Sequence, residues 1–279
     1  MRSLATGVRV PVLEAGAGGR PLLLVHGFTG AKEDFGDWID RFAAEGWWVV
    51  APDLRGHGDA DQPDDEAAYS LATFADDLVA LADDLGWERF SLLGHSMGGM
   101  IAQELVLRRT GHVERLVLMD THHGPVEGLD PATVALAVDV LRRDGLPALL
   151  ELIAMLPAGP KAPSDLRLRA EREGYAAFAD AKVHRCSGAM YAAMGLELTS
   201  RPDRLVELEA IDVPALVLVG AEDRDFVAAA ERMAAAIPGA RHVVVPDAAH
   251  SPQFEHPEAW WEAVAPFLSA GLPARPAAG

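Results

Sequence analysis

The chain has 279 residues, half of them apolar, with one cysteine (Cys186) and a formal net charge of −18. This length can bury a substantial core in one unit, no apolar run approaches the roughly 20 residues that span a bilayer, and a single cysteine excludes an internal disulfide. The charge disfavours nucleic acid and anionic membranes as partners, and residues 1–7 lack a signal-peptide core, so we expect a cytoplasmic protein.

The first half of the chain alternates predicted strands and helices. A lead-in strand and four buried strands are expected over 8–13, 21–25, 47–51, 90–93 and 116–119. Between them, one helix presents an apolar stripe from Phe35 to Phe42, and another begins at the N-cap Ser70. Alternation of this kind indicates a mostly parallel sheet with helices on both faces.

The second of these helices carries four aspartates. A metal cluster is conceivable there, but the expected role is a solvated acidic face, made of Asp76, Asp77, Asp83 and Asp84.

The residues that follow the strand at 21–25 are His-Gly-Phe-Thr-Gly, 26–30. Acyl transfer develops negative charge on a carbonyl oxygen, and two backbone N–H groups must face it. Phe28 is the candidate donor from this loop, because its flanking glycines allow a close approach. The competing interpretation is an ordinary strand-to-helix loop.

The most informative motif is Gly-His-Ser-Met-Gly at 94–98, between the strand at 90–93 and a helix from Gly99. A strand, a sharp turn and a helix are what a nucleophile elbow requires. The turn strains Ser96, and a side chain at Gly94 or Gly98 would crowd it. We therefore predict Ser96 as a nucleophile and Met97 as the second oxyanion donor; the alternative is a plain glycine-rich turn.

From 122 to 211 the chain has no confident strand and shows helical patterns broken by prolines. Helices are expected to begin at Asp130, Pro147 and Ser164, with a break at 159–163 and a further helix through Met190. Apolar helices need a surface to bury, and a lid excludes water from a reaction. We predict a core of 1–121 and 213–279, with a helical cap at 122–212.

After the cap, a buried strand at 215–219 precedes Asp223, and a strand from His242 leads to His250. A hydroxyl needs a base, so His250 is expected to take the proton of Ser96, and a carboxylate must then stabilise the imidazolium. Asp223 is the predicted acid; Glu222, Asp225 and Asp120, which ends the strand at 116–119, remain alternatives. A closing helix is expected from Pro257, shortened or bent at Pro266, with a loose tail at 271–279.

Four further side chains are candidates for lining a substrate pocket, the methionines because flexible thioethers suit irregular apolar substrates. They are His26, Met155, Met190 and Met194. For each methionine, packing in the core of the cap is the competing interpretation. His95 is expected to pack and hydrogen-bond behind the elbow. No phosphate-binding glycine loop is found, so neither a nucleotide cofactor nor a metal is predicted.

Together, HGFTG, Pro-Asp-Leu-Arg-Gly-His-Gly at 52–58, GHSMGG, Gly-Ala-Glu-Asp at 220–223 and His250 make the chain resemble the α/β-hydrolase superfamily over nearly its whole length. It is most similar to small acyl hydrolases of the carboxylesterase, C–C bond hydrolase and cofactor-free perhydrolase type. The resemblance implies the α/β-hydrolase fold with an inserted helical cap over the active site. Asp59 departs from the serine common after the 52–58 loop, which we interpret as structural.

The predicted function is a serine hydrolase that cleaves a carboxylic ester of a small or medium, largely apolar substrate through an acyl-enzyme. The alternatives are hydrolysis of a lactone or of a C–C bond in a vinylogous diketone, the latter weakened because the cap arginines look like surface charges. A non-catalytic small-molecule binding protein on the same fold also stays open. Ser96 argues against haloalkane dehalogenases and epoxide hydrolases, which place a carboxylate at the elbow.

Overall fold

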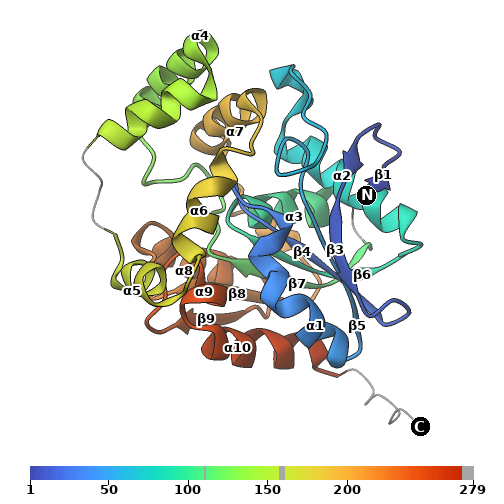
Figure 1. Cartoon of the computed structure of the whole chain (residues 1–279). Helices are drawn as coiled ribbons and strands as arrows, with labels where there is room; N and C mark the ends of the chain where they lie inside the picture. The colour runs from blue at the N-terminus through green and yellow to red at the C-terminus, as the bar shows by residue number, and fades with distance from the viewer. Residues whose placement is uncertain (110, 157–160, 272–279) are drawn as a thin grey trace.

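The computed structural model describes residues 1–109, 111–156 and 161–271. Its main sheet has seven strands in the order β3-β5-β4-β6-β7-β8-β9 (Figure 1). Their bounds are β3 Val12–Ala15, β4 Arg20–Val25, β5 Trp47–Pro52, β6 Phe90–His95, β7 Val113–Met119, β8 Ala215–Gly220 and β9 Arg241–Val245. β3 is antiparallel to β5 and the other neighbours are parallel, which confirms the predicted fold class.

The predicted lead-in strand at 8–13 is wrong as a single element. It is divided at Pro11 into β2 (Arg9–Val10), which pairs with β1 (Arg2–Ser3), and β3, which joins the main sheet. Proline has no N–H to donate to a ladder, so one strand ends and another begins around it.

Helices cover both faces of the sheet. Their bounds are α1 Gly36–Ala44, α2 Leu71–Asp84, α3 Met97–Arg108, α8 Arg224–Ala236, α9 Pro252–Glu255 and α10 Pro257–Ser269, with short 3-10 turns at Lys32–Phe35, Glu66–Ala68 and Glu207–Ala210. Alternate residues of β4 enter different cores: Leu22 and Leu24 pack with α1 and α10, whereas Leu23 and Val25 pack with α2, α3 and α8. Pro266 does not end α10, which continues to Ser269. None of the helices in the described ranges has the length and apolarity needed to cross a bilayer.

The acidic face predicted on α2 is wrong for one aspartate. Asp77 is only 3% exposed and accepts two hydrogen bonds from the Arg55 guanidinium, at 2.7 and 2.8 Å. Asp83 and Asp84 are exposed, as expected. Arg55 belongs to the 52–58 loop, so this buried ion pair fixes that loop to α2.

The segment between β7 and β8 contains α4 Pro131–Met155, α5 Pro163–Glu171, α6 Tyr175–Val183 and α7 Gly188–Ser200, which we call the helical insertion (Figure 1). Asp130 caps α4 by accepting the Thr133 N–H. α4 is two helical arms that meet at Gly145 (φ 85°), just before Pro147, and it packs on α7. Residues 159 and 160 of the predicted break, and 272–279 of the predicted tail, lie outside the described residues; residues 161 and 162 are not helical, and Pro163 begins α5.

Candidate active site

Ser96 lies in the turn between β6 and α3, with φ 55° and ψ −119°. This backbone conformation is strained for a residue that has a Cβ. The two flanking glycines have no room for a side chain: a Cβ on Gly94 would lie 2.3 Å from the Gly98 carbonyl oxygen, and one on Gly98 would lie 2.4 Å from that of Val25. The close packing of β4, β6 and α3 therefore depends on glycine at both positions. This packing holds Ser96 at the N-cap of α3.

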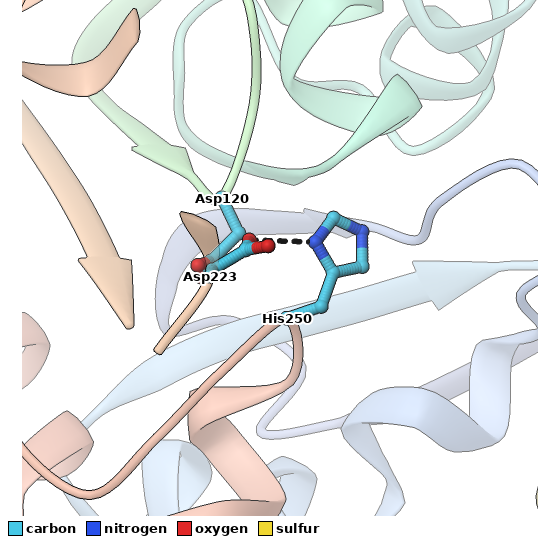
Figure 2. Close-up of side chains that lie close together, drawn as sticks. All are labelled: Asp120, Asp223 and His250. Carbon is cyan, nitrogen blue, oxygen red and sulfur yellow. Dashed lines mark hydrogen bonds and ion pairs between the residues drawn. The ribbon is translucent and has the colours of Figure 1, made fainter. Parts of the chain in front are cut away.

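The loops after β8 and β9 bring two more side chains to Ser96. His250 Nε2 is 3.0 Å from Ser96 Oγ. On the other side of the ring, His250 Nδ1 is 2.7 Å from Asp223 Oδ2 (Figure 2). Because a carboxylate only accepts, Nδ1 carries a proton and Nε2 is left to accept the serine hydroxyl. His95 Nε2 donates to the His250 carbonyl oxygen at 2.5 Å and so fixes the backbone that presents the imidazole.

The charge of Asp223 governs the His250 imidazole. Burial by itself lowers the pKa of His250, but the negative charge of Asp223 and its hydrogen bond outweigh burial, and the pKa is raised above its ordinary value of 6.5. The ring keeps 42% of its surface exposed, while the Asp223 side chain keeps 10%. The imidazole is therefore accessible and the carboxylate that contacts it is enclosed.

The alternative acids occupy other positions. Asp120 is buried and accepts the Gly220 N–H at 2.8 Å, with its carboxyl beside that of Asp223 (Figure 2). Burial and the neighbouring charge of Asp223 hold the pKa of Asp120 well above its ordinary value. Glu222 accepts the Ser164 N–H at 2.9 Å. Asp225 lines a cavity that lies over Ser96 and His250. Asp223 is thus the carboxylate that contacts His250.

Asp120, Asp223 and His250 are also a possible cation site, because one ligand atom of each lies within 4.8 Å of the others. The donor set speaks against this use. The 2.7 Å contact between Asp223 and His250 is a hydrogen-bond distance, and a metal would have to replace the proton on His250 Nδ1. The arrangement serves proton transfer better than metal binding.

The loop at 26–30 approaches Ser96 closely. A Cβ on Gly27 would lie 3.1 Å from that of Ser96, and no protein acceptor in the described ranges takes the Phe28 N–H. Met97 is the first residue of α3, so its N–H has no partner within the helix. His57 Nε2 donates to the Phe28 carbonyl oxygen at 2.5 Å and holds the loop. Both predicted donors therefore flank Ser96.

A cavity of about 410 Å³ lies over Ser96 and His250. Its wall includes charged side chains of the helical insertion that the sequence did not single out: Lys182, which pairs with Asp34 at 2.5 Å, and Arg169, which pairs with Asp165 at 3.0 Å. The expectation that the arginines of this segment are surface charges is wrong for Arg169. Sequence periodicity could not identify it, because α5 is too short and polar to show which side faces the cavity.

The structure does not bring the four predicted pocket side chains into this cavity. His26 is fully buried, and its Nε2 accepts the Leu54 N–H at 3.1 Å, so it joins two loops beneath the site. Met190 and Met194 are fully buried in the core, and Met155 is 79% exposed at the end of α4. The types of these residues do not determine the directions in which their side chains point.

Topology, a serine at a strained strand-to-helix turn and a cavity above it define a hydrolase of the α/β class. Residues 20–257 match the family described as alpha/beta hydrolase fold, so the chain belongs to that family and is a hydrolase. A putative 2-succinyl-6-hydroxy-2,4-cyclohexadiene-1-carboxylate synthase of Bacillus subtilis (strain 168) is 28% identical, over 96% of this chain and 97% of the relative.

Two solved structures are also similar. A thermophilic esterase from Thermogutta terrifontis has a TM-score of 0.79 at 29% identity, covering 94% of this chain and 93% of its own. Est816, described as an N-acyl homoserine lactone degrading enzyme, has a TM-score of 0.76 at 28% identity. The match covers 94% of this chain and 97% of the Est816 chain.

Proposed function

We propose that the chain cleaves a carboxylic ester through a covalent acyl-enzyme on Ser96. The observation that carries the proposal is the continuous hydrogen-bonded series from Ser96 Oγ through His250 to Asp223, at 3.0 and 2.7 Å. A serine hydroxyl is a weak nucleophile unless a base accepts its proton, and this series supplies the base together with the group that orients it.

The reaction has two halves. Ser96 Oγ attacks the ester carbonyl while its proton passes to His250 Nε2, and the N–H groups of Phe28 and Met97 receive the oxyanion. The imidazolium, stabilised by Asp223, then protonates the departing alcohol and leaves an acyl ester on Ser96. Water enters, gives a proton to His250 and attacks the acyl ester; collapse of the second intermediate releases the acid and restores the serine.

An ester is preferred over the other substrates. A lactone is a cyclic ester and needs the same steps, and the similarity to Est816 makes lactone hydrolysis the second candidate. A ring-cleavage diketone brings carboxylates, but the cavity cations Lys182 and Arg169 already pair with Asp34 and Asp165. Ser96 also argues against epoxide hydrolysis, which places a carboxylate at this turn.

Labelling with a fluorophosphonate probe tests the nucleophile. A single adduct on Ser96 is expected in the wild type, and none in Ser96→Ala or His250→Ala that retain native circular dichroism. Absence of labelling in folded wild-type protein would favour the non-catalytic binding protein. Turnover of short p-nitrophenyl esters, homoserine lactones and a dienoic diketone then ranks the substrate classes, and absent ester turnover would refute the first choice.

A further inference from the structure

A second cavity, of about 380 Å³, lies within the helical insertion between the two arms of α4 and α7. Its lining is almost wholly aliphatic and aromatic. Among the described residues that line it, only Thr133 and Tyr191 have a polar side-chain atom. We call this cavity the apolar groove; it differs sharply from the catalytic cavity, whose wall carries ion pairs.

The apolar groove adjoins the catalytic cavity. Phe28, Leu129 and Leu198 line both of them, so these side chains form the boundary that the two share. Phe28 is also the proposed oxyanion donor, and Tyr191 of α7 packs on its ring with centroids 4.8 Å apart. The groove therefore lies next to the loop that carries the proposed oxyanion donor.

Several lining residues of the groove remain exposed although they are large and apolar. Leu152 and Ile153 are each 44% exposed, and Leu136 is 67% exposed. Exposed apolar side chains that cluster around one depression mark a site for an apolar ligand. Because the groove shares three lining residues with the catalytic cavity, an apolar part of the substrate is the ligand that we consider.

We propose that the apolar groove binds the acyl chain of the substrate, and that this chain is a medium or long hydrocarbon. The inference rests on the proposed ester hydrolysis. With the carbonyl held at Phe28 and Met97, the acyl chain passes Leu198 into the groove, and the departing alcohol leaves through the charged cavity. A polar alcohol suits that exit, whereas the hydrocarbon keeps the acyl-enzyme in place.

A series of p-nitrophenyl esters from acetate to dodecanoate tests the proposal. Transfer of each methylene from water favours binding by about three- to fourfold, so kcat/KM should rise by up to that factor per methylene until the groove is filled. Lengthening the alcohol of an acetate ester should have no comparable effect. A flat acyl series, or a rise with the alcohol chain instead, overturns the proposal.

Two variants locate the effect in the groove. A Cβ on Gly195 would contact Val134 Cγ1 at an ordinary 3.6 Å, so Gly195→Leu fits at its first carbon and fills the groove with the rest. Leu152→Asn places an amide on an exposed part of the lining and keeps the fold. Both should lower the ratio of octanoate to acetate kcat/KM, by about threefold or more for each methylene excluded.

Met155→Asn is the matched control, since Met155 is an exposed apolar residue of α4 outside the groove lining, and its ratio should equal that of the wild type. The two proposals fail separately. Loss of fluorophosphonate labelling and of all ester turnover would reject the ester mechanism. Labelling and acetate turnover with an unchanged ratio in both groove variants would reject the acyl groove alone.

Discussion

The hydrogen bond between Asp223 and His250 determines the pH at which the proposed base stops working. Only neutral imidazole can take the serine proton, so activity is lost as the pH falls through the pKa of His250. Because Asp223 raises that pKa, the acid limb of kcat/KM against pH should have its midpoint above 6.5. Asp223→Asn should move the midpoint down and lower kcat by orders of magnitude. A wild-type midpoint below 6.5 would contradict this assignment.

Asp120 gives a second prediction at this scale. Burial and the charge of Asp223 hold the pKa of Asp120 well above its ordinary value, so we predict that this carboxyl is protonated in the working enzyme and that Asp120→Asn replaces one neutral donor with another. The midpoint of the acid limb should therefore stay where it is in the wild type. If Asp120 were ionised, the substitution would remove a negative charge near His250 and lower the midpoint. Asp120→Ala is the companion variant that removes the donor.

Sequence reasoning at the residue scale succeeded where chemistry restricts the residue type. Ser96, Asp223 and His250 were named because each follows a buried strand in a fixed order, and the structure places them in contact. The pocket methionines are predicted from the flexibility of their thioethers and their place in the expected cap, but Met190 and Met194 are buried in the core instead. Side-chain direction depends on how the insertion helices rotate, and their short periodic patterns did not determine it.

Among the elements, α3 packs closely against the end of β4. Gly98→Ala would put a Cβ 2.4 Å from the Val25 carbonyl oxygen, so we expect destabilisation of about 2 kcal/mol or more. Gly36→Ala in α1 is the control, because its Cβ would meet only Leu13 Cδ1, at 3.9 Å. Urea unfolding of both variants measures the difference; equal midpoints would show that α3 adjusts without cost.

The ion pair between Arg55 and Asp77 connects the 52–58 loop to α2. Both side chains are nearly enclosed, at 9% and 4% exposure, so removing one partner leaves a buried charge. Arg55→Met should destabilise the fold by roughly 3 kcal/mol or more, whereas the double variant with Asp77→Leu should recover much of that loss. Thermal unfolding of the single and double variants measures the coupling, and simple additivity would contradict it.

Element boundaries were less predictable than element types. The alternation of strands and helices is sufficient to predict the sheet, yet it merges β2 and β3, because Val8, Val10 and Val12 continue one alternating pattern across Pro11. The two helices expected from Asp130 and Pro147 exist as arms of α4, joined at Gly145 rather than separated by a loop. Local patterns specify which conformation a segment adopts, but tertiary packing decides where it stops.

At the scale of the whole molecule, the parallel sheet explains how distant residues meet. Ser96, Asp223 and His250 follow β6, β8 and β9, whose carboxyl ends lie at one edge of the sheet. Ligands bind at that edge in open α/β sheets. The insertion between β7 and β8 also begins at this edge. In our proposal it selects the substrate, while the sheet positions the reacting groups.

The net charge of −18 acts on the whole molecule and predicts a salt effect. A carboxylate-bearing ester is repelled at low ionic strength, and salt screens the repulsion. Its kcat/KM should rise between low and high ionic strength, while that of a neutral ester of equal size should change little. Stopped-flow or steady-state assays at several salt concentrations make the comparison; a fall for the anionic ester would indicate a local cationic site.

The backbone conformation of Ser96 lowers the thermal stability of the protein at a residue that the proposed activity needs. A positive φ of 55° on a residue with a side chain stores free energy of about 1–3 kcal/mol in the native state, which glycine would release. Ser96→Gly should therefore be inactive and yet melt at a higher temperature than Ser96→Ala, which keeps the strain. Selection for thermal stability alone would therefore favour replacement of Ser96 by glycine. Selection for enzymatic activity would be needed to keep a serine at this turn.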